Sequence, residues 1–491
     1  MATALTAEGY RVRILIPGED VDVRSPECYA VDLQAPAALK RVHRLIVGSE
    51  GERVGCLINL LPLVESLPHD SDADALRLAA FHLTNALFLL VREFHEDLAM
   101  AAEAGGSLLL NVTGLDGQFG LSDCDEAGVV AAGTLGVTKA FRREFPGVVV
   151  RTVDVDRRSP LLAQQLLDEL ERPHGPLETG LTATRRTTLE LIPQPLPPAL
   201  LAPPIDAASV VLVTGGGQGI TAEIVRGLAA SRCLVVIVGR SAMPSEESDE
   251  TRDLDDAGLR HGIVSKFQQS GESFTPLDIE QAFSLISKGR VLLSNLDSFR
   301  QSGARVEYHS LDVRDVSSLG RLIDDLYSRH GRIDGVLHGA GIIHDKLVVD
   351  KSPELFAEVF RTKVDSAFCL ATKLRPERLK FFVLFSSISG RFGNRGQTDY
   401  AAANETLNKL AQRLNREWTS TRVVAINWGP WNGGMVSDAL RLRYKARGIE
   451  LIPVGKGVEA CLSELTAVGG EPEIVLSSRL AAPSGFTPEV D

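Results

Sequence analysis

Short apolar runs alternate with helical patterns along the second part of the chain. These runs are typical of buried strands and lie at residues 209–214, 234–238, 305–311, 335–338, 381–385 and 423–427. The first part shows a similar alternation, with expected strands at 12–16, 55–60, 107–112 and 148–153 and a helix at 75–103. Alternation of strand and helix predicts an α/β fold with a parallel sheet covered on both faces.

A proline-rich segment separates the two parts. Residues 193–205 contain six prolines, and proline fixes φ and lacks an amide donor, so this segment is expected to be extended and to lie outside both cores. We therefore divide the 491 residues into 1–205 and 206–491. Within the second part, residues 241–302 are too long for a simple connection and predict a helical insert, with a helix at 278–299.

The two parts resemble each other in sequence. The strand at 108–113 is followed by Gly-Gln-Phe-Gly at 117–120, and the strand at 381–386 by Gly-Arg-Phe-Gly at 390–393. This favours a duplicated unit over chance similarity. After its first strand, however, the first part has Glu19 and Asp20, whose carboxylates would repel phosphate. We therefore expect two Rossmann-like, doubly wound subdomains, the first degenerate and structural and the second catalytic.

Composition and charge narrow the function classes. The net charge is −12 and the pI about 5.4, which argues against a general nucleic-acid binder because such proteins need a basic surface. The six cysteines are widely spaced and form no Cys/His cluster. This predicts reduced thiols, no metal site and a cytoplasmic protein. Neither a signal peptide nor a membrane span is expected from the sequence pattern.

A glycine-rich turn follows the first strand of the second part and opens a helix. Glycines there let backbone amides approach a pyrophosphate, and the helix N-terminus favours the anion. The residues expected to surround the phosphates are Thr214, Gly215, Gly216, Gly217, Gln218, Gly219 and Ile220. Thr221 replaces the usual last glycine of such turns, which predicts looser helix–strand packing.

The ends of the next strands predict how the rest of a dinucleotide is held. The second strand ends in Arg240 and Ser241, and an arginine at this point pairs with a 2′-phosphate, so NADPH is favoured over NADH. After the third strand, Asp312 and Val313 are expected beside the adenine. After the fourth, Gly339, Ala340 and Gly341 are expected to pass beneath the cofactor.

Four residues predict reductase chemistry. Ser387 follows the fifth strand, Tyr400 comes thirteen residues later, and Asn404 lies one helical turn beyond, on the same helix face. Lys363 lies on an earlier amphipathic helix. Ser387 and Tyr400 can donate to the oxygen of a ketone during hydride transfer, and Tyr400 can deliver the proton. A nearby Lys363 ammonium is expected to lower the pKa of Tyr400.

At these residues the chain resembles the short-chain dehydrogenase/reductase family. The classical pattern is Tyr-x-x-x-Lys, with an asparagine on the preceding helix, whereas here Asn404 and Lys363 are exchanged. That exchange is similar to the ketoreductase domains of type I polyketide synthases and polyunsaturated-fatty-acid synthases. The Asn-Trp-Gly-Pro-Trp sequence at 427–431 and the degenerate first part resemble those domains too. The resemblance implies reduction of a 3-oxoacyl thioester on an acyl carrier protein, beside other synthase domains.

The resemblance also bears on stereochemistry. Asp345 retains part of a Leu-Asp-Asp motif that accompanies the D (3R) hydroxyl configuration in that family, although His344 departs from it. The opposite class has a tryptophan where this chain has Phe392, and Met435 lies in the last-strand loop. We therefore expect Asp345, Phe392 and Met435 to contact the substrate and the product to be D configured.

A basic segment follows the last-strand loop. Residues 438–448 contain Arg441, Arg443, Lys445 and Arg447 and predict a helix over the site that meets an acidic carrier protein or its phosphopantetheine phosphate, or else a solvated helix face. The alternatives are a reduction-dead scaffold domain and a nucleotide-sugar epimerase or dehydratase, which would keep Tyr-x-x-x-Lys. Acyl chain length, final product, oligomeric state and the role of the insert stay open.

Overall fold

The computed structural model describes residues 1–48, 53–64, 72–172, 175–195, 203–244, 249–271, 273–433, 438–446, 449–467 and 469–478. The second part forms a seven-stranded sheet in the order β11-β10-β9-β12-β13-β14-β15, in which every pair is parallel. Its strands are β9 Val210–Thr214, β10 Leu234–Gly239, β11 Arg305–Ser310, β12 Gly335–His338, β13 Phe381–Ser387, β14 Arg422–Trp428 and β15 Glu473–Leu476. The order reverses between β9 and β12, and in such sheets ligands bind at the carboxyl ends of the strands there.

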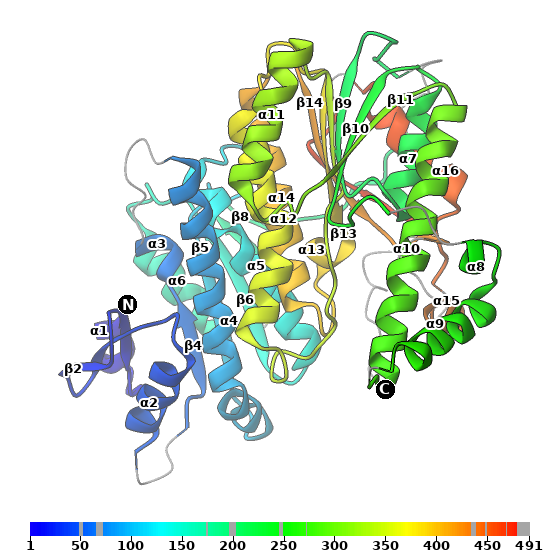
Figure 1. Cartoon of the computed structure of the whole chain (residues 1–491). Helices are drawn as coiled ribbons and strands as arrows, with labels where there is room; N and C mark the ends of the chain where they lie inside the picture. The colour runs from blue at the N-terminus through cyan, green and yellow to red at the C-terminus, as the bar shows by residue number, and fades with distance from the viewer. Residues whose placement is uncertain are drawn as a thin grey trace.

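Helices cover both faces of this sheet (Figure 1). The helices of the second part are α7 Gly219–Ala229, α8 Asp249–Arg252, α9 Asp256–Ser270, α10 Pro276–Gln301, α11 Val316–His330, α12 Pro353–Lys373, α13 Ile388–Phe392, α14 Thr398–Glu417, α15 Asp438–Ala446 and α16 Val454–Glu464. All the strands predicted for this part are confirmed, and β15 was not predicted. Its residues 473–476 are an edge strand paired only with β14 among the described strands, and they alternate too briefly to stand out.

The first part contains a five-stranded sheet in the order β4-β5-β6-β7-β8, parallel except for its last pair. Its strands are β4 Cys56–Asn59, β5 Leu108–Thr113, β6 Val149–Val155, β7 Glu178–Leu181 and β8 Arg186–Thr187, and its helices are α1 Ala2–Ala7, α2 Pro36–Val47, α3 Leu61–Val64, α4 Ala73–Glu103, α5 Glu126–Glu144 and α6 Leu162–Glu171. The predicted strand at 12–16 corresponds to β1 Ile14–Pro17, which lies in a separate three-stranded sheet with β2 Asp22–Ser25 and β3 Cys28–Val31. The expected α/β class with two Rossmann-like sheets is confirmed.

The two parts share one hydrophobic core. Helices α4 and α5 of the first part pack against α12 and α14 of the second, between the two sheets (Figure 1). Phe88 on α4 stacks on Phe356 on α12 with ring centroids 4.2 Å apart. A Cβ on Gly136 of α5 would lie 2.4 Å from the backbone of Ala401 on α14, so only glycine allows these two helices to approach so closely.

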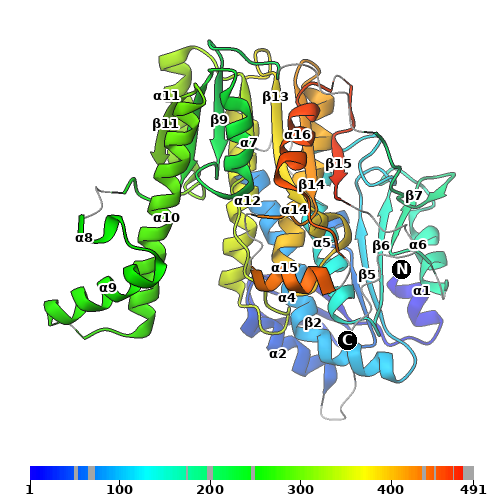
Figure 2. The same cartoon turned by 90° about the vertical axis from the view of Figure 1, so that its right-hand side faces the viewer.

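The insert forms an arm that projects from the catalytic part (Figure 2). The predicted helix at 278–299 is confirmed as α10, which begins with a capping box between Thr275 and Asp278 and a proline in its first turn. Its second half packs against β11 and α7, with Leu292, Leu296 and Phe299 buried.

Among the residues that the structure describes, one helix, α4, is long and apolar enough to cross a membrane by length and composition alone. In the structure 67% of its most apolar window is buried, and a core helix of this kind meets the same criterion. This helix packs against α12 and α5.

Candidate active site

One large cleft at the carboxyl ends of β9, β10, β12 and β13 contains most of the predicted site residues. Its volume is about 3170 Å³. Of the residues predicted to bind the cofactor or act in catalysis, it is lined by Gly215, Gly217, Gln218, Gly219, Ile220, Arg240, Ser241, Val313, Gly339, Ala340, Gly341, Lys363, Ser387 and Tyr400. Thr214, Gly216, Asp312 and Asn404 are absent from its lining, and Met435 lies outside the described residues.

The glycine turn is shaped for an anion. Gly215 has φ +74° and Gly219 has φ +67°, and a Cβ on Gly215 would lie 2.8 Å from the amide nitrogen of Ala340. Gln218, the N-cap of α7, makes no side-chain hydrogen bond to the helix, so the first amides of α7 stay available. These features fit the pyrophosphate of a dinucleotide.

A buried histidine connects this turn to the catalytic helix. His338 ends β12; its Nδ1 lies 2.8 Å from the hydroxyl of Thr214, and its Nε2 lies 2.9 Å from the carbonyl oxygen of Lys363. Burial and the neighbouring Lys363 lower the pKa of His338 to about 3, so the ring is neutral. A neutral ring that donates from Nε2 to the Lys363 carbonyl accepts at Nδ1 from the hydroxyl of Thr214. The oxygen of Thr214 in turn accepts from the Ala340 amide at 3.3 Å.

Thr221 packs against this connection. A Cβ on Gly339 would lie 2.4 Å from the hydroxyl oxygen of Thr221, so Gly339 provides the space that the threonine needs. Thr221 is 3% exposed. A glycine at position 221 would allow a close helix–strand contact. Here the contact is made by Thr221, which faces Gly339.

Arg240 lines the cleft where a 2′-phosphate is expected, and Arg314 shares a carboxylate partner with it. Arg240 lies 3.8 Å from a carboxylate oxygen of Glu358 on α12, and Arg314 lies 3.3 Å from the same carboxylate. Arg314 also binds Asp312 at 2.7 Å and holds the pKa of that carboxyl below its usual value. The carboxylate of Asp312 is thus engaged by Arg314, while Val313 faces the cleft.

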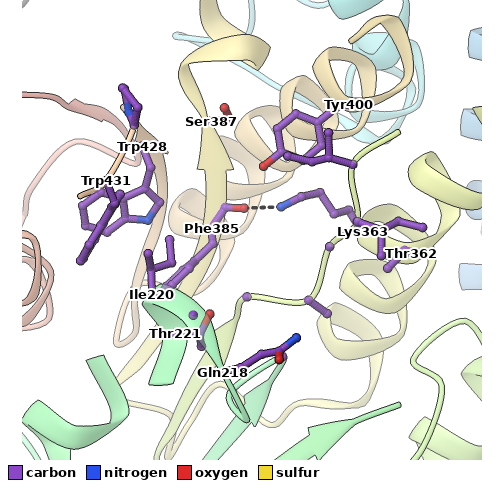
Figure 3. Close-up of a pocket in the computed structure, with 18 of the residues that line it drawn as sticks. Gln218, Ile220, Thr221, Thr362, Lys363, Phe385, Ser387, Tyr400, Trp428 and Trp431 are labelled. Carbon is purple, nitrogen blue, oxygen red and sulfur yellow. Dashed lines mark hydrogen bonds between the residues drawn. The ribbon is translucent and has the colours of Figure 1, made fainter. Parts of the chain in front are cut away.

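Lys363 lies buried beside Tyr400 (Figure 3). Its Nζ donates to the carbonyl oxygen of Phe385 at 2.6 Å and lies 5.5 Å from the centroid of the Tyr400 ring. A Cβ on Gly341 would lie 2.8 Å from Cε of Lys363, so this glycine makes room for the lysine. Burial lowers the pKa of Lys363 to about 7.

The hydroxyl of Tyr400 points toward the amino group of Lys363 in Figure 3. Burial raises the pKa of Tyr400 to about 12, against the smaller lowering effects of hydrogen bonds from Asn404 and Ser387. The sequence predicted a lowered pKa; in the structure the desolvation of the phenol outweighs any effect of Lys363. Tyr400 is therefore protonated at neutral pH.

Asn404 lies one turn after Tyr400 on α14. Its Nδ2 donates to the Tyr400 carbonyl at 2.7 Å, and its Oδ1 is buried without a hydrogen-bond partner among the described residues. The Ser387 hydroxyl caps α13 by accepting from the amide of Ser389 at 3.1 Å. Lys363, Ser387, Tyr400 and Asn404 thus come from α12, β13 and α14 and meet at one place.

The predicted substrate residues lie at the open side. Asp345 and Phe392 line the cleft, and the Asp345 carboxylate accepts from Nε2 of Gln397 at 3.0 Å. The helix predicted at 438–448 corresponds to α15, and its Tyr444 lines the cleft. Arg447 lies outside the described residues.

Three side chains that hold the loops before α12 and α14 in place were not predicted from the sequence. Lys351 and Asp399 form a buried ion pair at 2.7 Å, directly before Tyr400. Glu144, from the first part, accepts hydrogen bonds from two loops beside the site. Asp399 could have been suspected from its position next to Tyr400, but no local signal marks Glu144, which is 252 residues from its partner Gly396.

A doubly wound parallel sheet, a glycine turn at its switch point, and Lys363, Ser387 and Tyr400 in one cleft with Asn404 one turn beyond Tyr400 define a short-chain dehydrogenase/reductase fold. Comparison with known proteins gives the branch of that superfamily. Residues 284–433 match the family model of the KR domain, and the chain is similar to polyketide and polyunsaturated-fatty-acid synthases. The resemblance that the sequence suggested is confirmed, and the oxidoreductases of this family bind nicotinamide cofactors.

Individual relatives agree with this family. The chain is 26% identical over 417 residues to one component of the polyunsaturated fatty acid synthase of Thraustochytrium, covering 81% of this chain and 14% of that protein. It is 34% identical over 177 residues to polyketide synthase PksN of Bacillus subtilis, covering 35% of this chain and 3% of that protein. The chain thus spans only a small part of these curated relatives.

Solved structures share the fold over most of the chain. An N-terminal ketoreductase from the macrolactin assembly line has a TM-score of 0.68 at 17% identity, covering 96% of this chain and 83% of its own. A ketoreductase from the first module of phoslactomycin biosynthesis in Streptomyces has a TM-score of 0.58 at 25% identity, covering 78% of this chain and 79% of its own.

Proposed function

We propose that this chain reduces the 3-oxo group of an acyl thioester carried by an acyl carrier protein to the 3-hydroxyacyl thioester, with NADPH as the reductant. The observation that carries the proposal is the convergence of Lys363, Ser387 and Tyr400 in the cleft that the glycine turn also lines. Such a cleft holds a dinucleotide and a ketone side by side.

The reaction requires a hydride at C3 and a proton at the oxygen. When bound, the nicotinamide supplies the hydride. Ser387 and Tyr400 donate hydrogen bonds to the oxygen as negative charge develops on it. With a pKa of about 12 the Tyr400 phenol is protonated at neutral pH, and it can give its proton to the developing alkoxide, which is the stronger base. Lys363, with a pKa of about 7, can return a proton at neutral pH, and the free Oδ1 of Asn404 can orient a relay water.

The preference for NADPH rests on Arg240. Arg240 lines the cleft at the end of β10 and its side chain is half exposed, with a carboxylate oxygen of Glu358 at 3.8 Å. A 2′-phosphate carries more charge than that carboxylate and offers bidentate geometry to an arginine. Gly215, Gly217 and the first turn of α7 would hold the pyrophosphate.

The stereochemical proposal is a D (3R) alcohol. It is supported by Asp345, which lines the same cleft as Tyr400, and by Phe392 in place of a tryptophan. Chiral analysis of the alcohol made from a 3-oxoacyl thioester tests it, and a pure L product would overturn it.

The proposed partners are the acyl carrier protein with its phosphopantetheine arm and the other domains of a synthase. The cations at 441–447 in an otherwise acidic chain support docking of an acidic carrier. A cytoplasmic setting belongs to the same proposal.

The alternative is a scaffold domain that binds cofactor without reducing anything. The intact Lys363, Ser387, Tyr400 and Asn404 favour the enzyme, and an epimerase or dehydratase is disfavoured because Asn404 replaces the lysine of Tyr-x-x-x-Lys.

The experiment follows NADPH absorbance during reduction of a 3-oxoacyl thioester or of trans-1-decalone. We expect turnover by the wild type and a loss of at least about a hundredfold in kcat for Tyr400→Phe, because the acid is removed, with cofactor affinity retained. Equal inactivity of both proteins, with NADPH bound, would establish the scaffold function instead.

A further inference from the structure

We propose that Glu144 of the first part is a positioning residue that sets the geometry of the catalytic loops of the second part. This inference rests on the proposed reductase function. It assigns the first part a contribution to turnover that a purely supporting domain would lack.

Glu144 is the last residue of α5, and its carboxylate joins two loops that are far apart in sequence. One oxygen accepts from the amide of Val348 at 2.7 Å. The other accepts from the amide of Gly396 at 3.0 Å and from the hydroxyl of Thr398 at 3.3 Å. Val348 and Thr398 are fully buried, so both loops depend on this acceptor.

The two loops position Asp345 and Tyr400, which line the same cleft. The first loop carries Asp345, and the second leads directly into the turn of α14 that presents Tyr400. They are joined by the Lys346 amide donating to the Gly396 carbonyl at 3.0 Å and by Gln397 donating to Asp345 at 3.0 Å. A shift at Glu144 therefore moves both loops together.

A buried ion pair extends this connection to Tyr400. Lys351 donates to Asp399 at 2.7 Å and to the carbonyl of His344 at 2.7 Å. The other oxygen of Asp399 accepts from the amide of Tyr400 at 2.8 Å. The Val348 loop thus continues through Lys351 and Asp399 to the backbone of Tyr400.

The chemistry of the donors requires a carboxylate. Each of its two oxygens accepts, and neither carries a hydrogen. A glutamine would turn one N–H toward a main-chain N–H, leaving that buried donor unpaired. Burial raises the pKa of Glu144, while the amides of Val348 and Gly396 favour its ionised form.

The rest of α5 holds the same segment from its other end. Lys139 donates to the carbonyl of Gly390 at 3.2 Å, and Arg143 donates to the carbonyl of Phe392 at 3.3 Å. Lys139 also lies 3.0 Å from Glu178 of β7, whose carboxylate binds Arg391 at 2.6 Å. The segment from Ser387 to Tyr400 is therefore held by the first part along most of its length.

The test compares Glu144→Gln with Glu126→Gln, a matched control at the opposite end of α5. Glu126 also bonds the second part, through Arg413 at 2.8 Å, but at the distant end of α14. We expect Glu144→Gln to lower kcat about ten- to hundredfold on a small ketone with little change in KM, since small misplacement of reacting groups is costly, and Glu126→Gln to stay within about twofold.

A second readout does not depend on turnover. Hydrogen exchange followed by mass spectrometry should show faster exchange in peptides covering 344–350 and 394–400 for Glu144→Gln and unchanged exchange there for Glu126→Gln. Equal kcat losses in the two variants, or unchanged exchange in both peptides of Glu144→Gln, would overturn the proposal.

Two controls keep the outcome decisive. If Glu144→Gln does not fold, Thr398→Val removes one of the three donors and should give a smaller kcat loss in the same direction, whereas unchanged kcat would count against the proposal. A wild type that binds NADPH without turnover would refute the proposed function, and the exchange experiment would then still decide the positioning of the loops.

Discussion

The two ionisable side chains at the centre of the cleft are both driven toward their neutral forms. Burial raises the pKa of Tyr400 to about 12 and lowers that of Lys363 to about 7. A neutral phenol is a proton donor, and a lysine that titrates near pH 7 exchanges protons readily. The residue types were predictable from the sequence, but the direction of the tyrosine shift was not, because desolvation depends on everything packed around the phenol.

The shifted pKa of Lys363 predicts a pH-dependent stability difference. Below pH 7 the lysine is charged in both the folded and the unfolded chain, so the cost of burying the ammonium is fully present. Between pH 7 and 10.5 the folded chain loses the proton while the unfolded chain keeps it, so stability conferred by this site rises with pH. We expect Lys363→Met to abolish turnover, and the melting temperature of the wild type minus that of the variant to increase between pH 7 and about pH 10. A difference independent of pH would mean that Lys363 has its ordinary pKa.

At the scale of the element, sequence pattern located the strands of the catalytic sheet and the glycine turn within a residue or two. Buried parallel strands are continuous apolar runs, and a turn at positive φ requires glycine, so both leave a local signal. The strand β1 was predicted, but its place in a separate sheet left no such signal, and neither did the edge strand β15. Their pairing is set by tertiary contacts of half-exposed residues. Glu144 was missed for the same reason, since its partners are remote in sequence.

We expect the basic residues in and after α15 to contact the carrier protein. Reversing the charge of Arg443 and Arg447 should raise KM for a carrier-bound 3-oxoacyl thioester and leave KM for trans-1-decalone unchanged, because a small ketone does not use a protein–protein contact. Steady-state kinetics with both substrates measure the split. Equal changes for both substrates would show that this segment shapes the cleft and does not dock the carrier.

At the scale of the whole molecule, the division into 1–205 and 206–491 separates the five-stranded sheet from the seven-stranded sheet, and the two parts are joined through one core. The division falls between β8 and β9, while α4, α5, α12 and α14 fuse the two parts through contacts such as Phe88 on Phe356. The first part has Glu19 and Asp20 after β1, but β1 lies in a separate three-stranded sheet, so these carboxylates do not mark a cofactor-loop position of the five-stranded sheet. Helix α5 of the first part contacts the loops of the active site.

This shared core predicts cooperative unfolding. Phe88→Ala removes a fully buried ring and should cost about 3–5 kcal/mol. Calorimetry should show one transition that moves to lower temperature as a whole. Two transitions, with only the first shifted, would show that the parts unfold independently.

The most direct test of the proposed reaction traces the hydride. The chain is incubated with a 3-oxoacyl thioester on an acyl carrier protein and with NADPH deuterated at C4 on one face or the other, and the product is analysed by mass spectrometry. We expect one deuterium at C3 of a 3-hydroxyacyl thioester from one of the two labelled cofactors, no product with Tyr400→Phe, and slower conversion with NADH. Recovery of the unreduced thioester from a protein that binds NADPH would contradict the assignment of this chain as a ketoreductase.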